Sequence, residues 1–302
     1  MENDLSLGAA WMNGTVIPIS QATIPVNDWG LVHSDITYDV VPVIDGAFFR
    51  FDEYLARFLS SMKNLHLDPG MSKRDIQAAL HQMVGESNLR DSYVAMVCSR
   101  GKPKIAGSRD PRDCENHFFA WCVPYVHIIK PEVVEKGATA WIAQNAYRIP
   151  ENSVNPRVKN YHWGDFTQGI FEAKDKNYET VILLDYDGNV TEGPGFNVFA
   201  VKDKVLITPD RGVLAGVSRK TVLEMAEHLG INTSVRSLSV EELLEADEVF
   251  LSSSGGGVIP IIRVNETIFG NGASGPISVQ LNETYWKWTT LEKYRDPIDY
   301  AL

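Results

Sequence analysis

Two residues could carry chemistry in this chain, a lysine and a glutamate that each stand in a distinctive segment. Lys159 lies in RVKNYHWGD, residues 157–165, between two apolar stretches. Glu192 lies in TEGPGFN, residues 191–197, between two runs that read as strands. Taken alone, either could be an ordinary exposed charge. Together they match the two protein groups that pyridoxal phosphate chemistry requires, a lysine that forms a Schiff base and a carboxylate that holds the ring nitrogen.

A phosphorylated cofactor also needs a site for a dianion, and two segments could form one. Residues 214–219, LAGVSR, place a glycine at the entry to an amphipathic helix. Amides at the N-terminus of a helix favour anions. Residues 252–257, SSSGGG, follow an apolar strand and offer hydroxyls and bare backbone. The same run could be only a flexible turn, because serine and glycine dominate turns.

Other catalytic and binding motifs are missing or incomplete in the sequence. It contains neither GxxxxGK[ST] nor a well-placed GxGxxG, so nucleotide binding is unsupported. It lacks the GxSxG elbow of Ser-His-Asp hydrolases. DYDGN at residues 185–189 starts like a calcium loop, but Phe196 stands where the loop needs glutamate, so we expect a hairpin turn. We predict no metal site.

The composition excludes several classes of protein. The chain of 302 residues is long enough for one large domain or two medium ones. Its net charge of −11 argues against binding to nucleic acid. No apolar run approaches the roughly 20 residues of a membrane span, and the N-terminus lacks the features of a signal peptide. The 3 cysteines show no CxxC spacing and read as free thiols, so we expect a cytoplasmic protein.

The elements that must position these residues mix strands with helices. Hairpins are predicted at the turns Asn13-Gly14 and Asp45-Gly46. Apolar spacing predicts helices over residues 52–65, 72–86, 216–229 and 241–246, and an aromatic helix around 285–288. Strands are predicted over residues 93–99, 117–123, 139–142, 180–184, 197–201, 205–208 and 248–251. The absence of strict βαβ alternation favours the α+β class.

A domain boundary is predicted where prolines flank a short connection. Pro124 and Pro131 stand on either side of it, and prolines stiffen linkers and end regular structure. We therefore expect a small N-terminal domain at residues 1–124, a connection at 125–136 and a larger domain at 137–302.

With these segments lined up, the chain resembles the class IV, or fold type IV, pyridoxal phosphate aminotransferases almost from end to end. Within that family it is most similar to the (R)-selective amine transaminases. The matching segments are HSDITYDV at 33–40, DGAFFR at 45–50, VKN at 158–160, WGD at 163–165, TEGPGFN at 191–197, TPDRGVL at 208–214 and GPI at 275–277. The resemblance implies a small N-terminal α/β sandwich domain, a larger C-terminal pseudo-barrel domain that binds pyridoxal 5'-phosphate, and a homodimer.

The resemblance also implies roles for matched positions. Lys159 would be the catalytic Schiff-base lysine and proton shuttle, and Glu192 would keep the pyridine nitrogen protonated. The remaining cofactor-binding positions are Arg57, Leu214, Val217, Ser218, Ser253 and Ser254. The family often has threonine at the last two positions, and serine keeps the hydroxyl. Without the resemblance, Arg57 reads as an exposed helix arginine.

For the substrate, the resemblance points to His33, Tyr38, Val40, Tyr93, Trp163 and, again, Ser253. His33 also has a purely structural interpretation. Branched-chain aminotransferases carry an arginine two residues after the tyrosine that corresponds to Tyr93, and fungal (R)-amine transaminases tend to have a glutamate there. This chain has Ala95, which weakens the branched-chain interpretation and leaves a more apolar pocket.

The carboxylate of a keto acid must still be bound by a cation. Arg109, in GSRDPR at residues 107–112, lies in the loop where the family places a mobile arginine. Arg112 or Arg100 could take its place.

The expected reaction moves an amino group from a primary amine, of the (R)-configuration, to a keto acid such as pyruvate with ping-pong kinetics. The alternatives within enzymes are aminotransferases for D-amino acids or branched-chain amino acids, and aminodeoxychorismate lyase. A non-catalytic oligomeric binding protein on the same fold is the alternative from another class. For the expected transaminase, the predicted partners are small molecules, an amine and a keto acid, together with a second copy of the chain.

Overall fold

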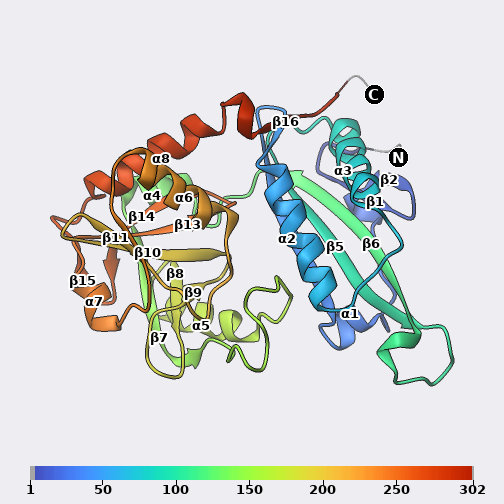
Figure 1. Cartoon of the computed structure of the whole chain (residues 1–302), viewed down its shortest axis with the longest axis horizontal. Coiled ribbons are helices and arrows are strands. Elements are labelled where there is room, and N and C mark those ends of the chain that lie inside the picture. The colour runs from blue at the N-terminus through green and yellow to red at the C-terminus, as the bar shows by residue number, and fades with distance from the viewer. Residues whose placement is uncertain (1–3, 301–302) are drawn as a thin grey trace. The chain divides into compact units, whose positions relative to one another are not determined.

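The computed structural model describes residues 4–300, which form two compact units with one main sheet each (Figure 1). Within the described range, unit 1 comprises residues 4–126, 158–162 and 289–300. Unit 2 comprises His127–Arg157 and Trp163–Trp288. The segment around Lys159 thus belongs to unit 1, whereas the chain on either side of it belongs to unit 2. The sequence pattern predicted two domains that are each continuous in sequence, whereas each unit consists of more than one segment. The connection at residues 125–136 stays a prediction.

Unit 1 is built on an antiparallel sheet. The strand order in the described residues is β16-β4-β3-β5-β6-β1-β2. The strands are β1 Ala9–Met12, β2 Thr15–Pro18, β3 Ile36–Ile44, β4 Ala47–Phe49, β5 Ser92–Pro103, β6 Cys114–Pro124 and β16 Arg295–Pro297. The helices are α1 Trp29–Val32, α2 Phe51–Asn64 and α3 Lys73–Ser87, with 3₁₀ turns η1 Ile19–Gln21, η2 Pro111–Asp113 and η3 Glu292–Tyr294. Helices α2 and α3 pack against this sheet (Figure 1).

Local signals explain the boundaries in unit 1. Asn13 and Asp45 adopt positive φ angles, as do the glycines that follow them, which suits tight turns between antiparallel strands and confirms both hairpins. Ser72 caps α3 in a reciprocal capping box with Asp75. β5 is longer than predicted, because a bulge that includes Gly101 lets the pairing with β6 continue.

Unit 2 is built on a mixed sheet that curls into a half-barrel, which confirms the expected α+β fold. The strand order is β12-β11-β10-β13-β14-β7-β8, with β9 and β15 added at β10 and β14. The strands are β7 Ala138–Tyr147, β8 Thr180–Leu184, β9 Glu192–Gly193, β10 Phe196–Lys202, β11 Val205–Thr208, β12 Thr233–Val235, β13 Glu248–Ser253, β14 Gly257–Val264 and β15 Thr267–Ile268. The helices are α4 Pro131–Lys136, α5 Gly164–Asp175, α6 Val217–His228, α7 Val240–Leu244 and α8 Pro276–Trp288.

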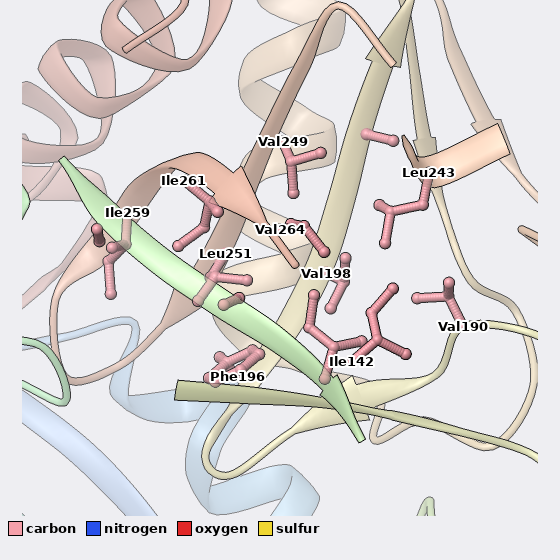
Figure 2. Packing of buried hydrophobic residues seen from close by; sticks show 14 of the residues in the cluster. Ile142, Val190, Phe196, Val198, Leu243, Val249, Leu251, Ile259, Ile261 and Val264 are labelled. Carbon is pink, nitrogen blue, oxygen red and sulfur yellow. The ribbon is translucent and has the colours of Figure 1, made fainter. Parts of the chain in front are cut away.

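One hydrophobic core cluster of unit 2 lies on one face of this sheet (Figure 2). It includes Ile142, Val190, Phe196, Val198, Leu243, Val249, Leu251, Ile259, Ile261 and Val264. Because side chains alternate along a strand, Asn197 and Phe199 point to the face opposite Val198. Phe199 stacks on Phe250 there, with ring centroids 4.9 Å apart. α6 and α8 pack against β13. Asn197 pairs with β13, and its side chain lies close to Gly216 at the start of α6.

Within residues 4–300, no helix combines the length and apolar character needed to cross a bilayer. Among the same residues, no cluster of three or more histidine, cysteine or acidic side chains could hold a metal ion.

Candidate active site

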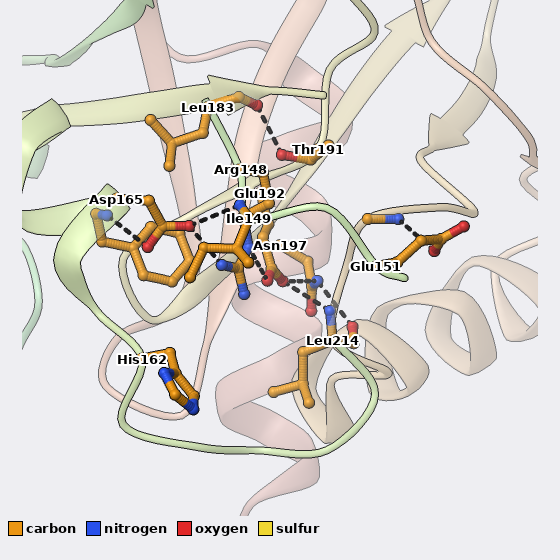
Figure 3. A network of polar contacts seen from close by, with 12 residues as sticks. Arg148, Ile149, Glu151, His162, Asp165, Leu183, Thr191, Glu192, Asn197 and Leu214 are labelled. Atoms are coloured by element: carbon orange, nitrogen blue, oxygen red, sulfur yellow. Dashed lines mark hydrogen bonds and ion pairs between the residues drawn. The ribbon is translucent and has the colours of Figure 1, made fainter. Parts of the chain in front are cut away.

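Glu192 is the centre of a buried polar network in unit 2 (Figure 3). The residue is 5% exposed, because β9 pairs with β10 and brings it into register with Asn197. Its Oε2 accepts hydrogen bonds from the backbone N–H of Leu214 at 2.8 Å and from Asn197 Nδ2 at 3.3 Å. The alternative interpretation, an exposed carboxylate in a turn, is therefore wrong. Leu214, predicted to bind the cofactor, orients Glu192 through its main chain.

An arginine that sequence reasoning missed completes this network. Arg148 follows β7 and donates from Nε to Glu192 Oε1 at 3.2 Å and from Nη1 to Asp165 Oδ2 at 2.6 Å (Figure 3). The side chains of all three residues are less than 10% exposed. The Arg148 guanidinium also lies 4.3 Å from the ring centroid of Phe166. Asp165 belongs to the WGD motif, which was the one available signal, but no motif surrounds Arg148.

The predicted phosphate cradle begins at α6. Gly216 is the N-cap of α6, which has no side-chain capping bond and no acidic residue in its first turn. Val217 and Ser218 are buried at the start of this helix. A Cβ atom on Gly216 would lie 2.1 Å from Asn197 Oδ1, so only glycine lets the helix start this close to the Glu192 network. The positive end of the helix dipole is therefore unopposed by its own side chains.

The three serines at the end of β13 have different surroundings. Ser252 lies opposite Asn197 in the β10–β13 register, and its Oγ is buried without a hydrogen-bond partner among the described residues. Ser253 Oγ donates to the carbonyl of Gly195 at 2.8 Å and accepts from the N–H of Gly255 at 3.1 Å. Ser254 is half-buried in the turn that leads to β14. Ser253 thus holds loops together, and Ser252, which the sequence did not single out, has the unsatisfied hydroxyl.

Lys159 is held in unit 1 by its main chain. Its carbonyl accepts hydrogen bonds from Thr37 Oγ1 at 2.5 Å and from the N–H of Tyr38 at 3.4 Å. Its own N–H donates to Ser61 Oγ at 3.3 Å. The side chain returns to the same strand, since Nζ lies 4.5 Å from the ring centroid of Tyr38. β3 and α2 thereby fix the position of the Lys159 backbone, and the ring face of Tyr38 lies next to the Lys159 amine.

An apolar wall adjoins Lys159 on the same face of the unit 1 sheet. Its buried members are Ile36, Tyr38, Val40, Ala95 and Val97, with Tyr93, Phe119, Trp121 and Tyr161 packed against them. Tyr38 stacks on Tyr161 at 4.3 Å between centroids, and Tyr93 stacks on Trp121 at 5.6 Å. Burial raises the pKa of Tyr93 and of Tyr161, so both hydroxyls stay protonated at neutral pH. Hereafter this set is the Tyr38 wall.

The predicted substrate residues belong to both units. Tyr38, Val40 and Tyr93 share one wall with Lys159 in unit 1. His33 is exposed at the C-cap of α1, where its ring contacts Trp29. Trp163 belongs to unit 2, where it is the N-cap residue of α5 and contacts Phe166.

Arg57 is an ion-paired residue of α2, not an exposed one. Its side chain is 12% exposed, and Nε and Nη2 donate to the two carboxylate oxygens of Asp39 at 2.8 and 2.7 Å. Burial lowers the pKa of Arg57, but the Asp39 carboxylate, together with Tyr54 and Tyr38, raises it, so the pKa is raised overall. Asp39 lies between Tyr38 and Val40 on β3, so it orients Arg57 from the strand that carries the Tyr38 wall.

The three candidate arginines for a substrate carboxylate differ in what they bind. Arg100 is buried and donates to both oxygens of Asp35 and to two main-chain carbonyls of the segment after α2. Arg112 pairs with Asp110, two residues away. Arg109 is exposed in the segment between β5 and η2. Of the three, Arg109 makes no ion pair within the described residues. It therefore remains the candidate for binding the substrate carboxylate.

The sequence of the chain matches a family model over residues 37–264, and the family is described as amino-transferase class IV. The chain belongs to the class IV aminotransferase family. Class IV aminotransferases are pyridoxal phosphate enzymes, so this protein is a pyridoxal phosphate-dependent aminotransferase. The enzyme class and cofactor predicted from Lys159 and Glu192 are confirmed at this level.

Curated relatives of this class IV aminotransferase cover nearly its whole length. A putative branched-chain-amino-acid aminotransferase from Methanocaldococcus jannaschii is 28% identical over 278 residues, which are 91% of this chain and 94% of the relative. A D-alanine aminotransferase from Bacillus licheniformis is 28% identical over 273 residues, 88% of this chain and 92% of the relative. Both are named for amino acid substrates, whereas the sequence motifs predicted (R)-amines.

A solved structure shows the same fold. The crystal structure of the branched-chain amino acid aminotransferase from Escherichia coli has a TM-score of 0.90 and 24% sequence identity to this chain. The match covers 96% of this chain and 99% of that one. The fold type IV architecture expected from the resemblance is thereby confirmed.

The residues of unit 2 fit a phosphorylated pyridine. A buried carboxylate with fixed hydrogen bonds, Glu192, suits a protonated ring nitrogen. An uncapped N-terminus of α6 and the unsatisfied hydroxyl of Ser252 both lie next to Asn197, which suits phosphate oxygens. The donor set therefore agrees with the cofactor of the family.

Replacing Asp39 with asparagine should destabilise unit 1 strongly. The substitution leaves the Arg57 guanidinium buried without its counter-charge, and breaking a buried ion pair from one side costs about 3 kcal/mol or more. Chemical unfolding followed by fluorescence measures the loss. The control is Asp52→Asn, whose exposed pair with Lys73 should contribute less than about 1 kcal/mol. Equal stability of the two variants would contradict the orienting role of Asp39.

Proposed function

We propose that this aminotransferase takes an amino group from an (R)-configured primary amine with an apolar substituent and gives it to a keto acid such as pyruvate. The observation that carries the proposal is Ala95 in the Tyr38 wall, at the position where branched-chain aminotransferases have an arginine. Ala95 is buried between Val40 and Trp121, its neighbours in the sheet register. A donor that lacks a carboxylate needs no cation there, and an aromatic wall favours an apolar substituent.

An amino acid aminotransferase is the second candidate, and the names of the relatives support it more directly. The relatives from M. jannaschii and B. licheniformis are named for branched-chain amino acids and D-alanine. The Tyr38 wall also suits a branched side chain. In this case another cation must bind the carboxylate of the donor, and the exposed Arg109 is the candidate.

In this proposal, each site residue has a distinct role. When bound, pyridoxal phosphate withdraws electrons from the carbon that bears the amino group, so that its proton becomes acidic. Lys159 holds the cofactor covalently, and its released Nζ then moves that proton, which requires the neutral amine. Glu192 keeps the proton on the ring nitrogen. Arg57, Val217, Ser218 and Ser254 bind the phosphate, together with Ser252.

The resemblance also supports a homodimer with small-molecule partners only. Both candidate reactions consist of two half-reactions, and the first product would leave before the keto acid binds, so the kinetics should be ping-pong.

The test is a visible absorption spectrum of the purified holoenzyme, recorded before and after addition of an amino donor without keto acid. We expect (R)-1-phenylethylamine to bleach the yellow protein, the (S)-enantiomer to leave it yellow, and pyruvate to restore the colour while alanine forms. Bleaching by L-leucine or D-alanine but not by either amine would support the second candidate. Loss of amino donor without formation of alanine from pyruvate would contradict both and point to elimination.

A further inference from the structure

We propose that Asp165 is a positioning residue for the cofactor ring: acting through Arg148, it supplies the negative charge that lets Glu192 keep the ring nitrogen protonated. This inference rests on the proposed role of Glu192. Neither the family match nor the resemblance assigns a role to Asp165 or to Arg148.

The contacts form one buried chain. Arg148 donates with Nε to Glu192 and with Nη1 to Asp165, so one guanidinium is shared between two carboxylates (Figure 3). The shorter contact, 2.6 Å, is to Asp165, and the contact to Glu192 is 3.2 Å. Asp165 is held in place by the backbone N–H groups of Ile149 at 3.0 Å and Phe166 at 2.8 Å. Arg148 is therefore drawn towards Asp165.

The charges explain why this sharing matters. Glu192 and Arg148 alone would form a neutral pair, and a neutral pair does little to stabilise a cationic ring in a site screened from water. With Asp165 the set of three carries one negative charge, which balances one protonated ring nitrogen. Each of the three side chains is less than 10% exposed, so solvent cannot supply this balance.

Arg219 is a further charged group near Glu192. Arg219, on α6, interacts electrostatically with Glu192 and also with Asp210. Burial lowers the pKa of Arg219, and these two carboxylates oppose that effect. Its guanidinium donates to Thr208 and to the carbonyl of Pro209. Arg157 repels Arg219 but is exposed, so solvent screens it. Asp210 opposes the charge of Arg219 as Glu192 does. Within the set joined by the hydrogen bonds of Arg148, Asp165 supplies the second negative charge.

The direct readout is the protonation state of the ring nitrogen, measured by ¹⁵N NMR of holoenzyme reconstituted with ¹⁵N-labelled pyridoxal phosphate. Asp165→Asn preserves size and one acceptor oxygen but removes the charge. We expect its ring nitrogen to lose the proton at a pH about one unit or more below that of the wild-type enzyme. We also expect kcat to fall with little change in KM, because donor binding is untouched.

A matched control lies on the same helix. Glu172 of α5 accepts hydrogen bonds from Trp141 Nε1 and from the backbone N–H groups of Gln144 and Asn145, much as Asp165 does from its neighbours. Glu172→Gln removes a carboxylate that supports the same strand, β7, but does not contact Arg148. Its ring nitrogen should titrate like that of the wild type.

The double variant Arg148→Met/Asp165→Asn separates charge from structure. It removes one positive and one negative charge, so the set again carries one negative charge on Glu192. We expect it to regain the wild-type titration of the ring nitrogen, which a merely structural role of Asp165 would not predict. If Asp165→Asn does not yield folded protein, Asp165→Ser, which keeps a small acceptor at the start of α5, is measured in its place.

The outcomes distinguish this inference from the function on which it rests. A wild-type-like ring nitrogen in the neutral Asp165 variant, or no recovery in the double variant, would overturn the role of Asp165. If Glu192→Gln also leaves the ring nitrogen unchanged, the proposed role of Glu192 fails as well. If Glu192→Gln shifts it and Asp165→Asn does not, Glu192 keeps its role and only the inference fails.

Discussion

Lys159→Ala should abolish turnover, leaving at most trace activity. The variant loses both the covalent attachment point and the amine that moves the substrate proton, so kcat should fall on the order of 10⁴-fold or more. The fold should survive, because the hydrogen bonds that hold residue 159 to Thr37, Tyr38 and Ser61 involve its main chain. Steady-state transamination with pyruvate measures the loss, and circular dichroism checks the fold.

Lys176→Ala is the matched control for this variant. Lys176 also places its Nζ against an aromatic ring, 4.7 Å from the Trp141 centroid, but it lies in unit 2 and is not one of the candidate site residues. Its removal should leave kcat unchanged within about twofold. Substantial activity in Lys159→Ala, or equal losses in the two variants, would sink the assignment of Lys159.

Glu192→Gln should be the second most damaging change. The amide cannot stabilise a positive ring nitrogen, and loss of an opposite charge within hydrogen-bonding distance shifts a pKa by about 1–3 units. The fraction of ring in the protonated form, and with it kcat, should fall about 10- to 1000-fold at pH values above the new pKa. The absorption spectrum and kcat, both followed against pH, measure the effect.

Glu248→Gln controls for the loss of a buried glutamate. Glu248 begins β13 in the same sheet and accepts the backbone N–H groups of Ile277 and Ser278 at the start of α8. Its replacement should lower stability but leave the pH dependence of kcat unchanged. If the pH dependence of kcat in Glu192→Gln matches that of the wild-type enzyme, Glu192 does not hold the ring nitrogen.

The elements of this fold were predictable where the signal is local. Turn chemistry at Asn13-Gly14 and Asp45-Gly46 and the cap at Ser72 depend on neighbouring residues, and the structure has each of them. The aromatic C-terminal helix was predicted only around residues 285–288, but α8 spans Pro276–Trp288. Its first turns carry no strong apolar period, and their contact with β13 and β14 decides the helix.

The site was predictable where the residue type is itself unusual in its setting. Lys159 and Glu192 stand in segments that few other functions explain. Arg148 could not be found in this way, because its partners Asp165 and Glu192 lie 17 and 44 residues away and it has no motif of its own. Ser252 could be named only as one member of the SSSGGG run, because strand register, not sequence, separates its surroundings from those of Ser253.

Substrate choice was the least predictable property. Motifs predicted the family, which the family match confirms over residues 37–264. The choice between an amine and an amino acid depends on a few side chains such as Ala95, and a change of one methylene in a pocket shifts selectivity by only about 1–3 kcal/mol. Such differences leave no pattern in a single sequence.

Tyr38 links two traits that a protein engineer would want to change separately. Its ring is part of the wall that we expect to meet the donor, and the same ring lies beneath the amine of Lys159 and against Tyr161. Shortening this side chain to admit a bulkier donor would also alter the electrostatic surroundings of the reactive lysine, so donor scope and intrinsic reactivity should evolve together at this position. The main-chain bond from Tyr38 to Lys159 is independent of side-chain identity. The position of the lysine backbone should therefore tolerate such redesign even when its reactivity does not.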